Sequence, residues 1–219
     1  MKKLLSLVTV IAVAMLMVNC KNGPEKKNDA TTANEEISAS EQTEAPKVID
    51  SLKLEWTGYK TTEKTPVKGV FKTVEIEGTN NSGKTPKEIL DGATVTVPVS
   101  SLFSGNEARD PKLINIFFGT MENTAALKGV LHFNGDKTTL AVTMNNVTKE
   151  VPVETTFANE NNAFFLEGDV QLSDFNASNA VEALAKACFE LHKGADGVSK
   201  TWGEAHFKGT VYFARSISK

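Results

Sequence analysis

The sequence predicts an all-β domain of about eight antiparallel strands accompanied by two short helices. From Leu52 to Arg215, segments with an apolar residue at every second position alternate with short runs of turn-forming residues. This period of two is typical of strands that bury one face, and the short connections favour antiparallel hairpins around one core. Apolar residues adopt helical spacing over 110–119 and 178–192. Eight such strands either close into a barrel or stack as a sandwich.

The first two strands differ in the regularity of their alternation. In the first, Leu52, Leu54 and Trp56 fall on one face. The second places apolar residues on both faces, which a bulge near Gly69 would explain. A polar loop, 79–91, follows and contains one helical turn near its end. The predicted strands span, in chain order, 52–59, 67–76, 93–99, 126–134, 138–145, 149–157, 163–172 and 200–215.

The centre of the chain joins a strand, 93–99, to a short and very apolar helix. Asp110 is a residue type that caps helix N-termini, Pro111 suits the first helical position, and Gly119 suits the position after the end. Such a helix needs a hydrophobic surface, which the mouth of a barrel or the open edge of a sandwich would provide. Arg109 and Asp110 are the best polar candidates. We expect the aspartate to cap the helix and the arginine to pair nearby, rather than to contact a ligand.

The second helix, 178–192, carries an apolar stripe that includes Val181, Leu184 and Cys188. The apolar setting of Cys188 predicts a small buried hydrophobic residue rather than a nucleophile. His192 lies four residues later and could share the same helix face. We expect the stripe to pack onto the core.

The first fifty residues differ in composition from the predicted domain, 51–219. Residues 1–19 combine a positive start with an apolar run that is short for a membrane span, as in a signal peptide. Cys20 follows directly, as in bacterial lipoproteins whose cysteine is lipidated after cleavage; ordinary secretion with cleavage nearby is the alternative. Residues 20–50 include a polar linker too poor in apolar residues to fold. We therefore expect a lipid anchor in the bacterial cell envelope, and Lys21 favours the outer membrane, facing the periplasm.

Charge and motif content argue against several classes of function. The formal net charge is −3 and no basic stripe occurs, so we expect no nucleic-acid binding. The histidines His132, His192 and His206 lack the spacing of metal ligands, and no Cys-x-x-Cys pair occurs. The Gly-x-Ser-x-Gly motif and glycine-rich phosphate loops are also absent. We expect no enzyme activity, and hence no catalytic residue, metal or cofactor.

Several short motifs together resemble the YceI-like family of lipocalin-like, polyisoprenoid-binding proteins. Residues 67–71, VKGVF, are similar to the family's V-x-G-x-F on the second strand. Residues 109–113, RDPKL, with Phe117-Phe118 are similar to its R-D-x-x-L…F-F. The meander and the late helix follow in the expected order, so the resemblance covers nearly all of 51–219. The chain departs from the family in its lipoprotein-like start, at 103–105, and in lacking the usual histidine near the second strand.

The resemblance implies an extended lipocalin-like barrel whose tunnel holds an isoprenoid or other long-chain lipid, as a carrier or store, without chemistry. The predicted dry faces suit such a tunnel and also suit an interior filled by its own side chains. A filled barrel would instead imply a structural or stress-related envelope lipoprotein acting through protein contacts. A homodimer is compatible with both readings. The predicted lining comprises Leu54, Trp56, Phe71, Val95, Val97, Phe117, Leu131, Phe133, Val142, Met144, Val153, Phe164, Leu166, Phe207 and Phe213.

Overall fold

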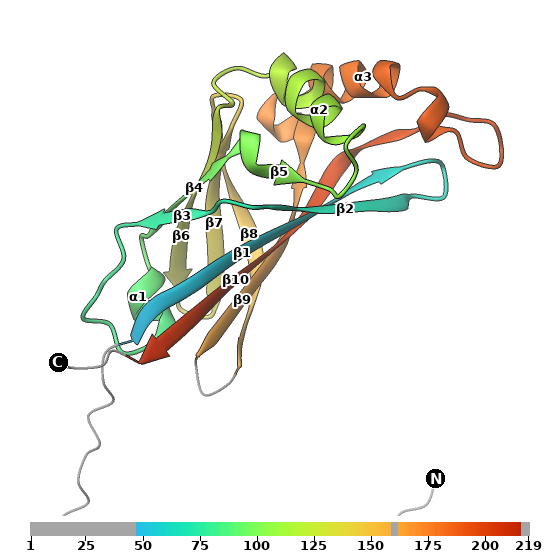
Figure 1. Cartoon of the computed structure of the whole chain (residues 1–219). Helices are drawn as coiled ribbons and strands as arrows, with labels where there is room; N and C mark the ends of the chain where they lie inside the picture. The colour runs from blue at the N-terminus through green and yellow to red at the C-terminus, as the bar shows by residue number, and fades with distance from the viewer. Residues whose placement is uncertain (1–46, 159–161, 216–219) are drawn as a thin grey trace, which may run out of the picture. The chain divides into compact units, whose positions relative to one another are not determined.

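The computed structural model describes residues 47–158 and 162–215; the predicted signal peptide, Cys20 and most of the predicted linker lie outside them. Antiparallel strands curl around a common interior, with short helices at both ends (Figure 1). The predicted fold class is therefore confirmed. The strands are β1 Lys47–Lys60, β2 Thr65–Phe71, β3 Glu75–Glu77, β4 Thr94–Pro98, β5 Leu102–Phe103, β6 Ala126–Asn134, β7 Lys137–Met144, β8 Val147–Ala158, β9 Ala163–Gln171 and β10 Thr201–Arg215.

The strands close into a barrel through two bent chain segments. The sheet order is β3-β4-β6-β7-β8-β9-β10-β1-β2-β5, so its two ends are β3 and β5. The chain runs directly from β2 into β3, and from β4 into β5 through the 3₁₀ turn η1, Val99–Ser101. Between the paired parts, the N–H of Lys72 donates to the carbonyl of Ser101 at 2.9 Å. Counting each bent segment as one strand recovers the eight that the sequence predicts.

The predicted second strand, 67–76, is wrong in one respect, because it is two strands. β2 pairs with β5 and β3 pairs with β4, and the η1 turn separates β4 from β5. The ladder therefore breaks between β2 and β3. No bulge forms at Gly69, which pairs in continuous register with Trp56. The β1–β10 ladder carries the irregularities instead, at Ile49/Ser51 and at Gly58/Lys60.

Strand β1 begins at Lys47, inside the segment that the sequence predicts as linker. Lys47, Val48 and Ile49 continue the ladder with the last residues of β10. The Lys47 ammonium is buried and donates to Oδ1 of Asn162 at 2.9 Å. These contacts place Lys47, Val48 and Ile49 in the sheet, although composition alone assigns them to the linker.

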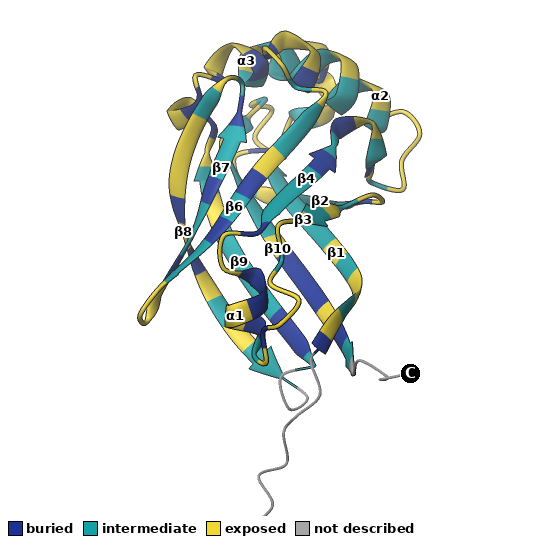
Figure 2. Ribbon diagram, turned by 90° about the vertical axis from the view of Figure 1, so that its left-hand side faces the viewer, coloured by how far each residue is buried: buried dark blue, intermediate teal, exposed yellow. Residues whose placement is uncertain are grey.

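Helical segments cover the two ends of the barrel. The predicted helix at 110–119 forms as three consecutive pieces, and the predicted helix at 178–192 ends early, at Ala187. These segments lie together over one end, and α1 lies at the other (Figures 1 and 2). Within the described part of the chain, no helix has the length and apolarity needed to cross a membrane. The segments are α1 Pro86–Leu90, α2 Asp110–Lys112, the π-helix η2 Leu113–Phe117, η3 Phe118–Thr120, η4 Leu172–Phe175, α3 Ser178–Ala187 and η5 Glu190–His192.

The buried residues form two clusters along the barrel axis. The first lies under the helices and includes Phe71, Phe118 and Phe175. The second lies near α1 and is centred on Phe164, which has no exposed surface. Along the strands between them, buried and exposed residues alternate (Figure 2). The barrel therefore has two separate clusters of buried apolar residues.

Candidate functional site

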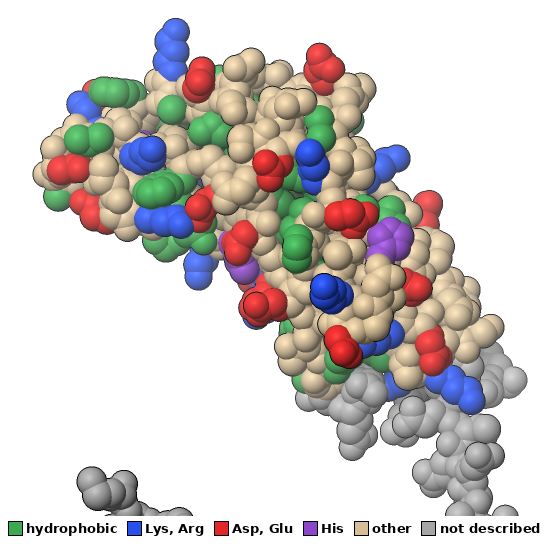
Figure 3. Space-filling model, turned by 180° about the vertical axis from the view of Figure 1, so that it is seen from behind, with side chains coloured by type: hydrophobic (Ala, Val, Ile, Leu, Met, Phe, Trp, Pro, Cys, Tyr) green, Lys and Arg blue, Asp and Glu red, His purple; other side chains and the backbone are tan. Residues whose placement is uncertain are grey.

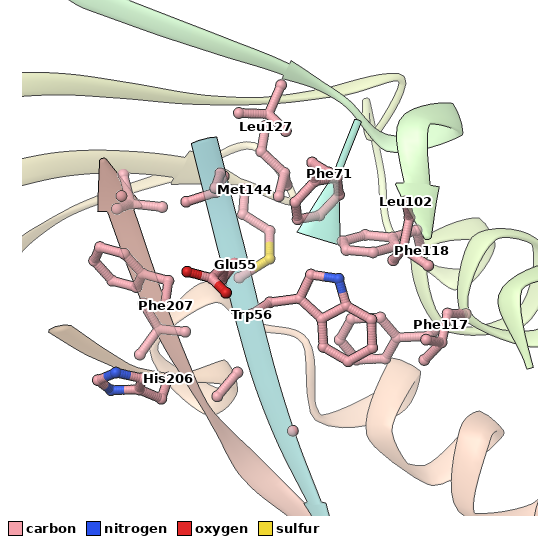
Figure 4. A pocket seen from close by; sticks show the side chains of 18 of the residues that line it. Glu55, Trp56, Phe71, Leu102, Phe117, Phe118, Leu127, Met144, His206 and Phe207 are labelled. Atoms are coloured by element: carbon pink, nitrogen blue, oxygen red, sulfur yellow. The ribbon is translucent and has the colours of Figure 1, made fainter. Parts of the chain in front are cut away.

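An apolar cavity of about 590 Å³ occupies the interior of the barrel. Side chains from every strand except β8 border it, together with residues of η2, η3, η4, α3 and η5. Its volume lies within the range of about 300–1,000 Å³ that is usual for ligand sites. Figure 4 shows Trp56, Phe117 and Met144 pointing toward one another from β1, η2 and β7. An interior filled by its own side chains would leave no such space.

Most of the predicted lining residues border this cavity. They come from strands on all sides of the barrel, so the alternation predicts correctly which side chains face inward. Whether they contact a ligand stays a prediction. The residues at the cavity are Leu54, Trp56, Phe71, Val95, Val97, Phe117, Leu131, Val142, Met144, Phe164, Leu166 and Phe207.

Phe133, Val153 and Phe213 do not border the cavity. Val153 and Phe213 belong to the second cluster of buried residues, and Phe133 packs against it. The rings of Phe133 and Phe157 stand 5.9 Å and 5.2 Å from the ring of Phe164, between centroids. Alternation along a strand tells which side chains point inward but not how far along the axis they lie. These three residues therefore close one end of the barrel instead of lining the space.

Helical residues that the sequence did not assign to the site complete the wall. Val181, Leu184 and Cys188 of the late helical region border the cavity, as does Phe118 of η3. The rings of Phe117 and Phe118 meet edge to face, with centroids 4.9 Å apart. The apolar stripe at 178–192 was the signal for these residues, and the expectation that it packs onto the core is met by packing over the cavity.

Two glycines show how the interior is kept open. Gly58 borders the cavity, and a Cβ added there would find no heavy atom within 4 Å. Gly69 faces the same interior, but a Cβ there would come within 2.3 Å of Cζ2 of Trp56. Gly58 thus leaves space unoccupied, whereas Gly69 makes room for the indole.

Polar groups gather where the cavity opens beside η5. The ammonium of Lys60, the last residue of β1, donates to the carbonyl of Leu191 at 3.0 Å. Nδ1 of His192 lies 2.6 Å from Oγ1 of Thr201, which is the register partner of Lys60 on β10. Lys60, His192, Thr201 and Arg109 all border the cavity. We call this opening the mouth.

The imidazole of His192 is held neutral at the mouth. Burial lowers its pKa from the ordinary value of 6.5, because the charged form is poorly solvated there. The positive charges of Lys60 and Arg109 lower the pKa further. The side chain is only half-buried, so its proton remains open to exchange with solvent.

Comparison with known families places this architecture. The family model of the YceI-like domain matches residues 42–200, most of the chain. The chain belongs to the YceI-like family. No curated protein sequence matches it. The resemblance that the motifs indicate is thereby confirmed.

Solved structures share the fold of this YceI-like domain at low sequence identity. A polyisoprenoid-binding domain from Saccharophagus degradans, implicated in plant cell wall breakdown, aligns with a TM-score of 0.56 and 9% identity, covering 78% of this chain and 99% of its own. BcnA of Burkholderia cenocepacia aligns with a TM-score of 0.50 and 16% identity, covering 76% and 99%. These likenesses establish the fold.

The Arg109-Asp110 motif of this YceI-like domain works differently from the prediction. Asp110 is not the helix cap; its Oδ1 accepts hydrogen bonds from the N–H and the hydroxyl of Ser104, at 3.0 Å and 2.5 Å. The side chain of Asn106 caps the turn instead, since its Oδ1 accepts from the N–H groups of Ala108 and Arg109. The aspartate thus ties β5 to the helix, and the arginine is left to border the cavity without an ion-pair partner among the described residues.

Further reactive side chains of the described residues include His206, Asp169 and Cys188. His206 contacts Asp169 at 3.0 Å, and the two residues lie on the neighbouring strands β10 and β9. Cys188 is buried and borders the cavity. Within 47–158 and 162–215, no group of three His, Cys, Asp or Glu residues is placed to hold a metal ion. What the site offers is an apolar space with a polar opening.

Proposed function

We propose that this YceI-like domain binds an isoprenoid or other long-chain lipid in its cavity and carries or stores it without altering it. The observation that supports this most is the unfilled apolar interior, about 590 Å³ in volume. A chain of methylene or isoprene units matches such a wall, because most of the wall is apolar and the chain itself needs no hydrogen bond. The S. degradans relative, described as polyisoprenoid-binding, supports the same class of ligand.

The energetics favour a carrier that works beside a membrane. Burial of a methylene from water stabilises by about 0.8 kcal/mol, but a long-chain lipid starts in a bilayer where its chain is already dry. The net gain is then small and depends on fit and on contacts with the polar end. Tethering the domain to the bilayer raises its effective concentration there.

We further propose that Cys20 carries a lipid anchor and that the domain faces the periplasm from the outer membrane. The supporting observations are the short apolar run of residues 1–19, the cysteine that follows it, and the lysine after that cysteine. This placement would keep the cavity within reach of its lipid source.

The test is to express the full chain in bacteria, purify it, and identify lipids in an organic extract by mass spectrometry. Gly58→Phe should abolish co-purification, because its ring would fill open cavity space, whereas Gly58→Ala should retain the lipid. Melting temperatures of both variants check that they fold. Empty extracts from the unaltered protein, or equal lipid in Gly58→Phe, would overturn the proposal.

The alternative was a structural or stress-related lipoprotein with a filled barrel. It requires side chains to occupy the interior, and the cavity leaves that space vacant. No contact in the described residues favours a protein partner over a lipid, so we propose the single function above.

A further inference from the structure

The mouth of the cavity carries positive charge from two separate parts of the fold. Lys60 ends β1, Arg109 and Lys112 belong to the α2 segment, and the neutral imidazole of His192, which ends η5, lies beside them. All four side chains border the cavity. Residues so distant in sequence converge only because the barrel and its covering helices bring them to one opening.

The contacts hold these groups at the mouth instead of leaving them to swing into solvent. The Lys60 ammonium is tied to the carbonyl of Leu191 at 3.0 Å, and His192 to Thr201 at 2.6 Å. The Lys112 ammonium donates to the carbonyl of Ala108 at 3.1 Å. Carbonyls and hydroxyls do not neutralise the cations, so their positive charge remains available.

Carboxylates do not balance this charge. Glu55 and Glu204 border the cavity wall, but they pair with Lys53 and Lys64 respectively. Among the described residues, no carboxylate lies within ion-pair distance of the cations at the mouth. The outer face in Figure 3 shows acidic and basic side chains intermixed, as expected for a chain of net charge −3.

We propose that the mouth binds the anionic end group of the lipid, a phosphate or a carboxylate, while its chain occupies the cavity. This deepens the proposed function and rests on it. Arg109 can bind two oxygens of such a group at once, and Lys60 adds a point charge from the opposite strand. Burial and, after it, the positive charges of Lys60 and Arg109 lower the pKa of His192, so both cations lie near its imidazole. An apolar chain alone would gain nothing from these charges.

The first test compares ligands of equal chain length on the unaltered full-length protein. The probes are a long-chain alcohol, its phosphate monoester and the matching carboxylic acid, with affinities measured by calorimetry at low salt. We expect both anions to bind roughly tenfold or more tightly than the alcohol, with the advantage shrinking as salt is added. Equal binding of alcohol and anions would overturn this inference and leave the proposed function standing. Failure of all three to bind would instead refute the proposed function.

The second test removes the charge while keeping the side-chain bulk. Lys60→Gln and Arg109→Gln should each reduce the preference for the anions over the alcohol several-fold, and melting temperatures of both variants check that they fold. Lys137→Gln, at the first residue of β7 and at the opposite end of the barrel, is the matched control and should preserve the preference. An unchanged preference in the mouth variants, or an equal loss in Lys137→Gln, would overturn the assignment of the end group to this mouth.

Discussion

The indole of Trp56 lies directly against Gly69, its register partner on β2. An added Cβ at Gly69 would stand 2.3 Å from Cζ2 of the indole and 2.6 Å from the carbonyl oxygen of Phe103. The Trp56 Nε1–H points to the carbonyl of Val70, at 3.4 Å. The lack of a side chain at Gly69 therefore allows the indole of Trp56 to take this position in the cavity wall.

Gly69→Ala should destabilise the domain, because both the indole and a backbone carbonyl would have to move. Overpacking of this kind costs about 1–3 kcal/mol in free energy of unfolding. Gly58→Ala is the matched control, since its methyl group enters open space and the unfolded chain has less conformational entropy with alanine than with glycine, which slightly favours the folded state. Urea unfolding midpoints of the two variants give the comparison. A Gly69→Ala variant as stable as Gly58→Ala would contradict this account of the packing.

His192 should make the stability of the domain depend on pH. Its pKa is lower in the folded chain than the ordinary 6.5, so the unfolded state binds more protons between the two values. The contribution of His192 to stability is full above 6.5 and declines as the pH falls through the window below it. His192→Gln should show a smaller decline in urea midpoint between about pH 7.5 and about pH 5.5. The same decline in both proteins would argue against it.

Removal of the Asn106 side chain should weaken the start of the α2 segment. Asn106→Ala loses two accepted backbone hydrogen bonds and should cost about 1 kcal/mol of unfolding free energy. Asp110→Asn retains an acceptor oxygen for Ser104 and should cost clearly less. Thermal or urea unfolding measures both. If Asp110→Asn were the more harmful change, the aspartate and not the asparagine would be the important group.

Cys20 should be the site of lipid attachment. Cells grown with labelled palmitate should incorporate the label into the unaltered protein and not into Cys20→Ala. Cys188→Ala, which removes the other cysteine, should keep the label. Gel autoradiography after immunoprecipitation reads the outcome. Label retained by Cys20→Ala would place any lipid elsewhere.

The fold was largely predictable because one-sided apolar alternation repeats through most of the chain. What the pattern could not give was the break between β2 and β3, since it depends on a turn in a partner segment that is distant in sequence. The ordering of Lys47–Asp50 also escaped prediction. That stretch directly follows the polar linker composition, and its place in β1 comes from pairing with the end of β10.

The sequence predicts which side chains face the barrel interior but not how far along the barrel axis each one lies. Inward-facing positions such as Leu54 and Val142 follow from alternation, and both border the cavity. Phe133 and Phe213 have the same pattern yet pack in the second cluster, because position along the axis is set by the whole barrel. The polar groups of the mouth have no local sequence pattern, because Lys60, Arg109 and His192 are far apart in the chain and come close only when it folds.

The packed cluster around Phe164, with Ile89 and Leu90 from α1, seals one end of the barrel. A lipid that enters by the mouth would then go in with its tail foremost. A tail longer than the blind interior would leave surplus methylenes in water, each forgoing about 0.8 kcal/mol. Among lipids that differ only in chain length, the domain should consequently bind most tightly the one whose terminal methyl just reaches the sealed end.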